Sequence, residues 1–309
     1  MKKILYLLLI CSIAVSVSAQ SNESKDELFS KIAKLTQKKK PEDTEKAYQL
    51  AKDYLARFGK DNDDKTKKIR DFVEKYRLAK FNESLDSLNI QAAMSYAKDI
   101  LAENPEDSYV TMNLALGGFD FYVKKQDNSI VNQTLDYAKQ TLQLFDKGKL
   151  PREYTPLKSK EDAQATMHYI IGMLSINSDI KEAARNFFRA VSFNSQIKSK
   201  ADPYYVIAFY YEKVYESASE EFRKKHQDNR TSDAEFEKDR QKINLIIDRM
   251  IDAYARAVNL GTIEKHPSVD IWKQRLTEAY KFRHNTDSTL EDYIKNIMNK
   301  EIPDPFNIQ

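Results

Sequence analysis

The side chains that most often carry catalysis or bind metals are few in this chain, and they are not grouped. No two of the four histidines lie three or four residues apart, the spacing that would place both on one helix face beside a shared metal ion. They are His168, His226, His266 and His284. The chain also lacks a glycine-rich phosphate loop and a Gly-x-Ser-x-Gly nucleophile sequence. We therefore expect no enzymatic activity, no metal site and no cofactor.

His168 is the histidine with the most informative surroundings. It lies in the apolar stretch from Met167 to Leu174. A single histidine on an apolar helix face is more often a core residue with a satisfied hydrogen bond than a ligand of a metal or substrate. We expect His168 to be such a core residue.

Tyrosine is the residue type with the clearest potential for binding. The chain has 18 tyrosines and 15 phenylalanines, and aromatic residues crowd the segment 203–215. One face of a helix cannot bury all of them, and tyrosines in a groove supply rigid, amphipathic contact area. We name Tyr204, Tyr210 and Tyr211 as candidate partner-binding residues. The alternative is that they belong to a thick core contacted from both sides.

The spacing of small residues predicts the elements that would position these side chains. Ala183, Phe187 and Ala190 are four and then three residues apart, which places all three on one helix face. Small residues on that face allow a partner helix to approach closely. This spacing of small residues therefore predicts the second helix of a stacked pair. The same spacing of small or apolar residues recurs at 47–54, 93–100, 250–257 and 290–297.

Glycine and proline separate the predicted helices. Gly59, Gly148 and Gly261 each follow a helical run, where glycine commonly ends a helix, whereas Gly117-Gly118 lies inside one and indicates close helix packing. No run alternates apolar and polar residues long enough to form a strand, so the fold should be all-α. We predict one helical domain over 20–309. Its helices are expected at 23–37, 43–58, 64–81, 88–103, 107–124, 129–146, 160–176, 179–194, 203–225, 232–259, 267–283 and 287–300.

The segment 1–19 is predicted to be a secretory signal peptide. Lys2 and Lys3 precede an apolar run, and Val17-Ser18-Ala19 offers small residues for cleavage. A membrane anchor is the alternative, but the run is short for a bilayer-spanning helix, which needs about 20 residues. After cleavage we expect no membrane span and a periplasmic or secreted protein.

Cys11, the only cysteine, lies in the same segment and raises the alternative of a bacterial lipoprotein. The lipoprotein pattern places a small residue just before the cysteine, whereas Ile10 is bulky. We therefore favour cleavage after Ala19. The remaining chain would have no cysteine, and so no disulfide and no thiolate nucleophile.

The helix pairs resemble a divergent tetratricopeptide repeat. In that family the second helix carries alanine, an aromatic residue four positions on, alanine three further on and proline five further on. The segment from Ala93 to Pro105 has the spacing without the aromatic residue, and the segment from Ala183 to Ala190 has the residue types without the proline. The resemblance implies a right-handed superhelix of about six antiparallel helix pairs, with a concave groove lined by the first helices.

The resemblance also points to Tyr109 and Asn113 on the expected first helix 107–124. Some family members bind a partner's C-terminal carboxylate through lysine and asparagine residues on successive first helices. Asn113 stands just before Leu114, at a position where such an asparagine can occur. Matching basic residues on the neighbouring first helices are not evident. We include Tyr109 and Asn113 among the candidate partner-binding residues.

The charge balance argues against nucleic acid as a partner, because 50 basic and 47 acidic residues nearly cancel. The expected function is that of an exported scaffold that binds a protein or peptide in a bacterial cell envelope. The alternative is a helical glycan-binding or hydrolytic protein that uses groove aromatics and carboxylates. Loss of activity on changing one carboxylate, with folding intact, would favour the enzyme.

Overall fold

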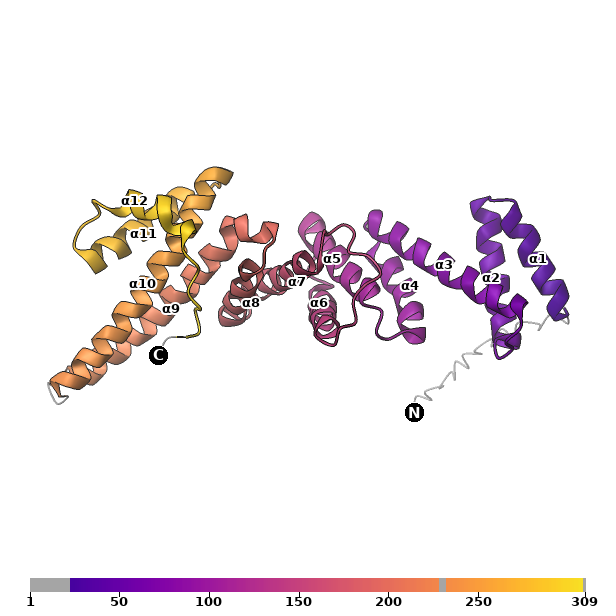
Figure 1. Cartoon of the computed structure of the whole chain (residues 1–309), viewed down its shortest axis with the longest axis horizontal. Helices are drawn as coiled ribbons and strands as arrows, with labels where there is room; N and C mark the ends of the chain where they lie inside the picture. The colour runs from indigo at the N-terminus through magenta and orange to yellow at the C-terminus, as the bar shows by residue number, and fades with distance from the viewer. Residues whose placement is uncertain (1–22, 228–231, 308–309) are drawn as a thin grey trace, which may run out of the picture. The chain divides into compact units, whose positions relative to one another are not determined.

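The computed structural model describes residues 23–227 and 232–307, which form helices joined by loops and contain no β-strand (Figure 1). The predicted signal peptide and Cys11 lie outside the described residues. Two short 3-10 helices, Gln196–Ser199 and Ile297–Asn299, accompany the α-helices. The α-helices are α1 (Lys25–Gln37), α2 (Pro41–Phe58), α3 (Asp64–Asp86), α4 (Ile90–Glu103), α5 (Ser108–Lys125), α6 (Val131–Asp146), α7 (Lys160–Ser175), α8 (Ile180–Ser192), α9 (Ala201–His226), α10 (Asp233–Glu264), α11 (Val269–His284) and α12 (Leu290–Asn296).

Local sequence explains where half of these helices begin. The first four N–H groups of a helix lack partners within it, and a short polar side chain just before the helix can accept from them. Ser24 and Glu27 form a complete capping box at the start of α1. Single side-chain caps begin five further helices. These caps are Asn89, Asp107, Ser159, Asp179 and Ser232.

The predicted helix ends are partly confirmed. Gly59 stands at the end of α2, and Gly148 follows α6 with a φ of 74°, a left-handed conformation that favours glycine. The prediction for Gly261 is wrong, because this residue lies inside α10. A Cβ at Gly261 would lie 3.0 Å from the Trp272 ring, so this glycine allows α11 to pack closely on α10. The helix instead ends at Glu264, and the capping residue Lys265 has a φ of 55°.

The described residues form two compact units that divide within α3, after Tyr76. The first contains α1, α2 and the N-terminal part of α3. Its core holds Ala47, Ala51 and Tyr54, the small-residue face predicted for α2. The Tyr54 hydroxyl lies 3.3 Å from the Thr66 hydroxyl, so its polar tip has a buried partner.

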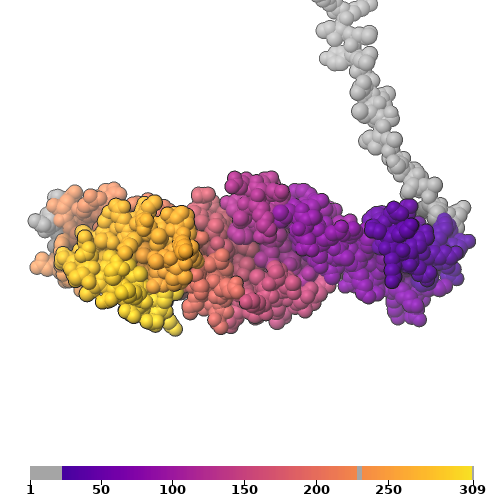
Figure 2. Space-filling model, turned by 90° about the horizontal axis from the view of Figure 1, so that it is seen from above, coloured from indigo at the N-terminus to yellow at the C-terminus, as the bar shows by residue number. Residues whose placement is uncertain are grey.

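The second unit, Arg77–Gln309, stacks its helices in sequence order. Each helix from α4 to α10 packs against the next one, in adjacent antiparallel pairs, α5 also contacts α7, and α12 packs against α10. Figure 2 shows the same order on the surface, where each colour band of this unit borders those of its neighbours in the chain. Sequential packing of helix pairs is compatible with the tetratricopeptide-like arrangement that the sequence suggests.

Small residues produce the close packing, as predicted. Ala93, Ala97, Ala183 and Ala190 are fully buried. The Gly117-Gly118 pair lies at two helix contacts. A Cβ at Gly117 would lie 2.4 Å from Leu85, and one at Gly118 would lie 2.3 Å from the Thr134 hydroxyl. Larger side chains at these positions would push neighbouring helices apart.

The last part of the chain is held against the long α9–α10 pair. After α12 the irregular segment 300–307 crosses from α10 to α9 as a C-terminal strap (Figure 1). The buried Arg256 donates to the Glu301 carbonyl oxygen at 3.0 Å and to Asp252 Oδ1 at 2.7 Å. Near the end of the strap, the Phe306 ring lies 5.5 Å from the Tyr210 ring.

Candidate functional site

Two of the three candidate tyrosines on α9 are core residues. Tyr204 and Tyr211 are each 1% exposed, which corrects the expectation that they face a groove. The Tyr204 hydroxyl donates to the Lys198 carbonyl at 2.9 Å, and burial raises the pKa of Tyr204 to about 12. A partner could not contact either ring without opening the core.

Tyr210 is partly exposed, and the C-terminal segment of the same chain packs against its ring. The centre of its ring lies 5.8 Å from that of Tyr211 and 5.5 Å from that of Phe306. Helix α9 therefore needs its many aromatic residues because α8, α10 and the C-terminal strap all pack against it. This is the thick core that the sequence left as the alternative for these tyrosines.

Tyr109 and Asn113 line a groove with a volume of about 730 Å³. Its walls come from the C-terminal part of α3, from α5, from α7 and from the loop before α7. The Tyr109 hydroxyl donates to Asn82 Oδ1 at 3.2 Å, and Asn113 Nδ2 donates to the Tyr109 carbonyl at 2.9 Å. We call this the first-helix groove, because α5 and α7 are the first helices of their pairs.

Further residues of the first-helix groove were missed from the sequence. The Phe119 and Tyr169 rings meet edge to face with centroids 6.1 Å apart, and Lys200 Nζ lies 5.4 Å from the centre of the Tyr169 ring. Lys200 lies just before α9 and not within a first helix, where the basic residues of carboxylate-binding family members lie. For Tyr169 the sequence did contain a signal. The run Met167–Leu174 has apolar residues on all sides of the helix, which indicates that the helix contacts neighbours on more than one side.

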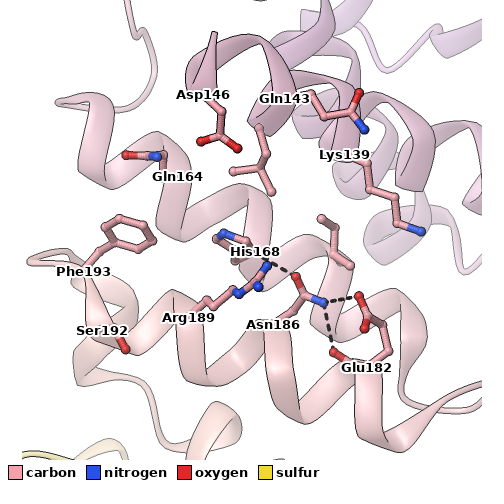
Figure 3. A pocket seen from close by; sticks show the side chains of 12 residues that line it. Lys139, Gln143, Asp146, Gln164, His168, Glu182, Asn186, Arg189, Ser192 and Phe193 are labelled. Carbon is pink, nitrogen blue, oxygen red and sulfur yellow. Dashed lines mark hydrogen bonds between the residues drawn. The ribbon is translucent and has the colours of Figure 1, made fainter. Parts of the chain in front are cut away.

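A second pocket of about 630 Å³ lies between α6, α7 and α8 (Figure 3). We call it the second-helix pocket. Polar side chains repeat at intervals of three and four residues on its walls, so each helix presents one polar face to it. They are Lys139, Gln143 and Asp146 on α6, Gln164 and His168 on α7, and Glu182, Asn186, Arg189 and Ser192 on α8.

A hydrogen-bond chain runs through this pocket, as the dashed lines in Figure 3 show. Asn186 Nδ2 donates to the carbonyl of Glu182 at 2.9 Å and to its Oε1 at 2.8 Å. The amide oxygen of Asn186 therefore faces His168 and accepts from Nδ1–H at 2.9 Å. His168 is 8% exposed, so the prediction of a hydrogen-bonded core histidine is confirmed.

Comparison with known proteins finds no matching family model, no matching curated protein and no matching solved structure. The resemblance to tetratricopeptide repeats therefore depends on the residues and on the helix pairs. Within the described ranges, no cluster of three or more histidine, cysteine or carboxylate side chains could hold a metal ion. None of the described helices is both long and apolar enough to cross a bilayer.

His168 should make the stability of the second unit depend on pH. Burial lowers the pKa of His168, the hydrogen bond to Asn186 partly opposes this, and the facing charges are Arg189, Asp146 and Glu182. Between the lowered folded pKa and about 6.5, the unfolded histidine carries a proton that the folded one does not. Stability should fall as the pH drops through this window, by at most about 1.4 kcal/mol per pH unit.

Urea denaturation between pH 7 and pH 5 would measure this effect, followed by the fluorescence of Trp272. This is the only tryptophan of the chain and is buried in the second unit. A His168→Gln variant should show a shallower pH dependence than the wild type. His284, which is exposed, provides the control as His284→Gln. Equal pH slopes for both variants and the wild type would contradict the prediction.

Proposed function

We propose that this chain is a helical-repeat scaffold that binds a protein or peptide partner through the first-helix groove. The observation that carries the proposal is that successive first helices, α5 and α7, contact each other and share one groove wall. Stacked helix pairs create extended binding surfaces of this kind. The groove also contains polar groups and partly exposed aromatic rings, the combination that orients a ligand and supplies contact area.

The groove is suited to a peptide in an extended conformation. The side-chain amides of Asn82 and Asn113 come from different helices, and an amide can both donate to a peptide carbonyl and accept from a peptide N–H. Phe119 and Tyr169 offer apolar surface to a side chain of the peptide. The exposed Lys200 makes no ion pair among the described residues, so its ammonium favours an acidic group on the partner.

The proposal extends to features of the sequence outside this groove. The basic, apolar and small-residue order of 1–19 supports export to a bacterial envelope, in the periplasm or outside the cell. The paired helices support a tetratricopeptide-like, right-handed superhelix of about six pairs. We propose a binding role without catalysis, because no motif for catalysis is present in the sequence.

The test is selection from a phage-displayed library of random linear peptides, followed by fluorescence anisotropy on the peptides selected. Asn113→Ala and Lys200→Glu should each weaken binding about tenfold, equal to about 1.4 kcal/mol. With wild-type protein, added salt should weaken binding, whereas Lys200→Glu should cancel or reverse this trend, because it replaces an attractive charge in the contact with a repulsive one.

Matched controls lie on exposed positions away from the groove, on α6 and α8. Asn132→Ala and Lys181→Glu change the same residue types and should leave the dissociation constant unchanged. Circular dichroism would establish that all four variants keep the wild-type helix content. Peptides that bind with the same affinity to groove and control variants would place the binding surface elsewhere and contradict the proposal.

A further inference from the structure

The second-helix pocket shares no lining residue with the first-helix groove, and the inference drawn from it does not depend on the proposed function. Helix interfaces in a repeat stack are normally apolar. Here Asn186 is 3% exposed and His168 is 8% exposed, and both face the pocket (Figure 3). The hydrogen bond to Asn186 satisfies Nδ1 of His168, and no described residue of the pocket bonds to Nε2.

The other ring nitrogen of His168 determines what the pocket can accept. Because Nδ1 carries the proton that Asn186 accepts, Nε2 of the neutral ring has a free lone pair. No hydrogen bond to Nε2 occurs within the described ranges of the chain. A ligand in the pocket would therefore need to present a hydrogen-bond donor, such as a hydroxyl or N–H group, to this atom.

The charged side chains of the pocket are arranged without mutual pairing. Lys139, Arg189 and Asp146 make no ion pair with any described residue. The fourth charged side chain, Glu182, accepts hydrogen bonds from Asn186 and from Arg185, which lies outside the pocket lining. Two cations and two carboxylates line the same pocket, so it has no formal net charge. Because these charges cancel, the pocket offers no net attraction to a simple anion such as phosphate or to a simple cation.

We propose that the second-helix pocket binds a saccharide. A sugar carries no charge, and each of its hydroxyls both donates and accepts, which matches the mixture of carboxylate, amide, guanidinium and imidazole groups on the walls. The Phe193 ring stacks on the His168 ring at 6.1 Å, with planes 16° apart, and provides an apolar surface for the C–H face of a sugar ring. The volume of about 630 Å³ falls in the range of small-molecule sites and exceeds what one free amino acid would fill.

The experiment is saturation-transfer difference NMR on the full chain with trisaccharide probes: cellotriose, maltotriose, xylotriose and chitotriose. L-glutamine serves as a zwitterionic probe, and inorganic phosphate, which has no C–H protons to observe, is added as an anionic competitor. The proposal expects saturation transfer to at least one trisaccharide, competition between trisaccharides that bind, and no loss of that transfer when phosphate is added. Transfer to no trisaccharide, or to L-glutamine alone, would overturn it.

Variants then locate the binding. Asp146 is exposed and makes no hydrogen bond or ion pair with the described residues, so Asp146→Asn should fold normally. It should weaken trisaccharide binding at least tenfold, as should Arg189→Met. Asp136→Asn provides the matched control, because Asp136 is an exposed carboxylate on the same helix and does not line the pocket. Equal binding by Asp146→Asn, Arg189→Met and Asp136→Asn would overturn the assignment to this pocket.

Discussion

Replacing Asp252 with alanine is expected to lower the free energy of unfolding of the second unit by about 3–5 kcal/mol. Asp252 accepts from Arg256 Nε at 2.7 Å, and the guanidinium also donates to the Glu301 carbonyl. The Arg256 side chain is only 3% exposed. Without Asp252, a buried cation would keep a single carbonyl as its partner, which does not offset the loss of water.

The size of this effect comes from burial, and a double variant can establish that. Burial raises the pKa of the Asp252 carboxyl, and the Arg256 guanidinium opposes the rise without cancelling it. Both charges therefore cost free energy to bury, so replacing the pair with Asp252→Leu and Arg256→Met should recover most of the lost stability. Trp272 fluorescence during urea denaturation would measure both variants.

An exposed pair with the same helical spacing serves as the control. Lys124 and Asp120 lie four residues apart on α5, with Nζ and Oδ2 2.9 Å apart and more than half of each side chain exposed. Asp120→Ala should cost about 0.5 kcal/mol or less, since water screens exposed pairs. Similar losses for Asp252→Ala and Asp120→Ala would show that the Asp252–Arg256 pair is not buried as described.

Alanine at Tyr204 or Tyr211 is expected to reduce the free energy of unfolding by about 3–5 kcal/mol, the range for removing a buried aromatic ring. Both rings are fully enclosed by α9, α10 and their neighbours. Tyr210→Ala should cost less than half as much, because its ring is partly exposed and packs on the C-terminal strap. Urea denaturation would rank the three variants, and equal losses would be incompatible with the different burial of the rings.

Phenylalanine at the same two positions separates the ring from its hydroxyl. Tyr204→Phe should cost about 1 kcal/mol, because it removes the hydrogen bond to the Lys198 carbonyl. The Tyr211 hydroxyl is buried and has no hydrogen-bond partner among the described residues, so Tyr211→Phe should be neutral or stabilising. A larger loss for Tyr211→Phe than for Tyr204→Phe would indicate that the Tyr211 hydroxyl has a partner after all.

Helix positions followed closely from local sequence, and errors arose where a distant residue decides the local structure. Predicted and observed boundaries of α5 and α6 differ by no more than two residues. Helix α10 extends to Glu264 instead of ending before Gly261. Glycine ends many helices, but here the absence of a Cβ admits Trp272 from the following helix. The choice between these two uses of glycine depends on a tertiary contact.

The candidate sites show the same division. The abundance of tyrosine on α9 was visible in the sequence, but which of these tyrosines are buried was not. Periodicity shows which residues share a helix face, and it does not show how many neighbouring elements cover the helix. Three elements cover α9, so Tyr204 and Tyr211 became core residues. Tyr109 and Asn113 do line a groove, together with Lys200, which lies far along the chain.

By itself the sequence determined the all-α class, the pairing of the helices and the small-residue faces on which they pack, because these depend on spacings within one or two turns. It also indicated that His168 would be hydrogen-bonded in a core. Only the tertiary structure decided which aromatic rings are enclosed, that Asn186 orients His168, and that polar faces of α6, α7 and α8 meet in one pocket. Those outcomes depend on how separate helices are rotated against each other, and that rotation is set by packing across the whole stack.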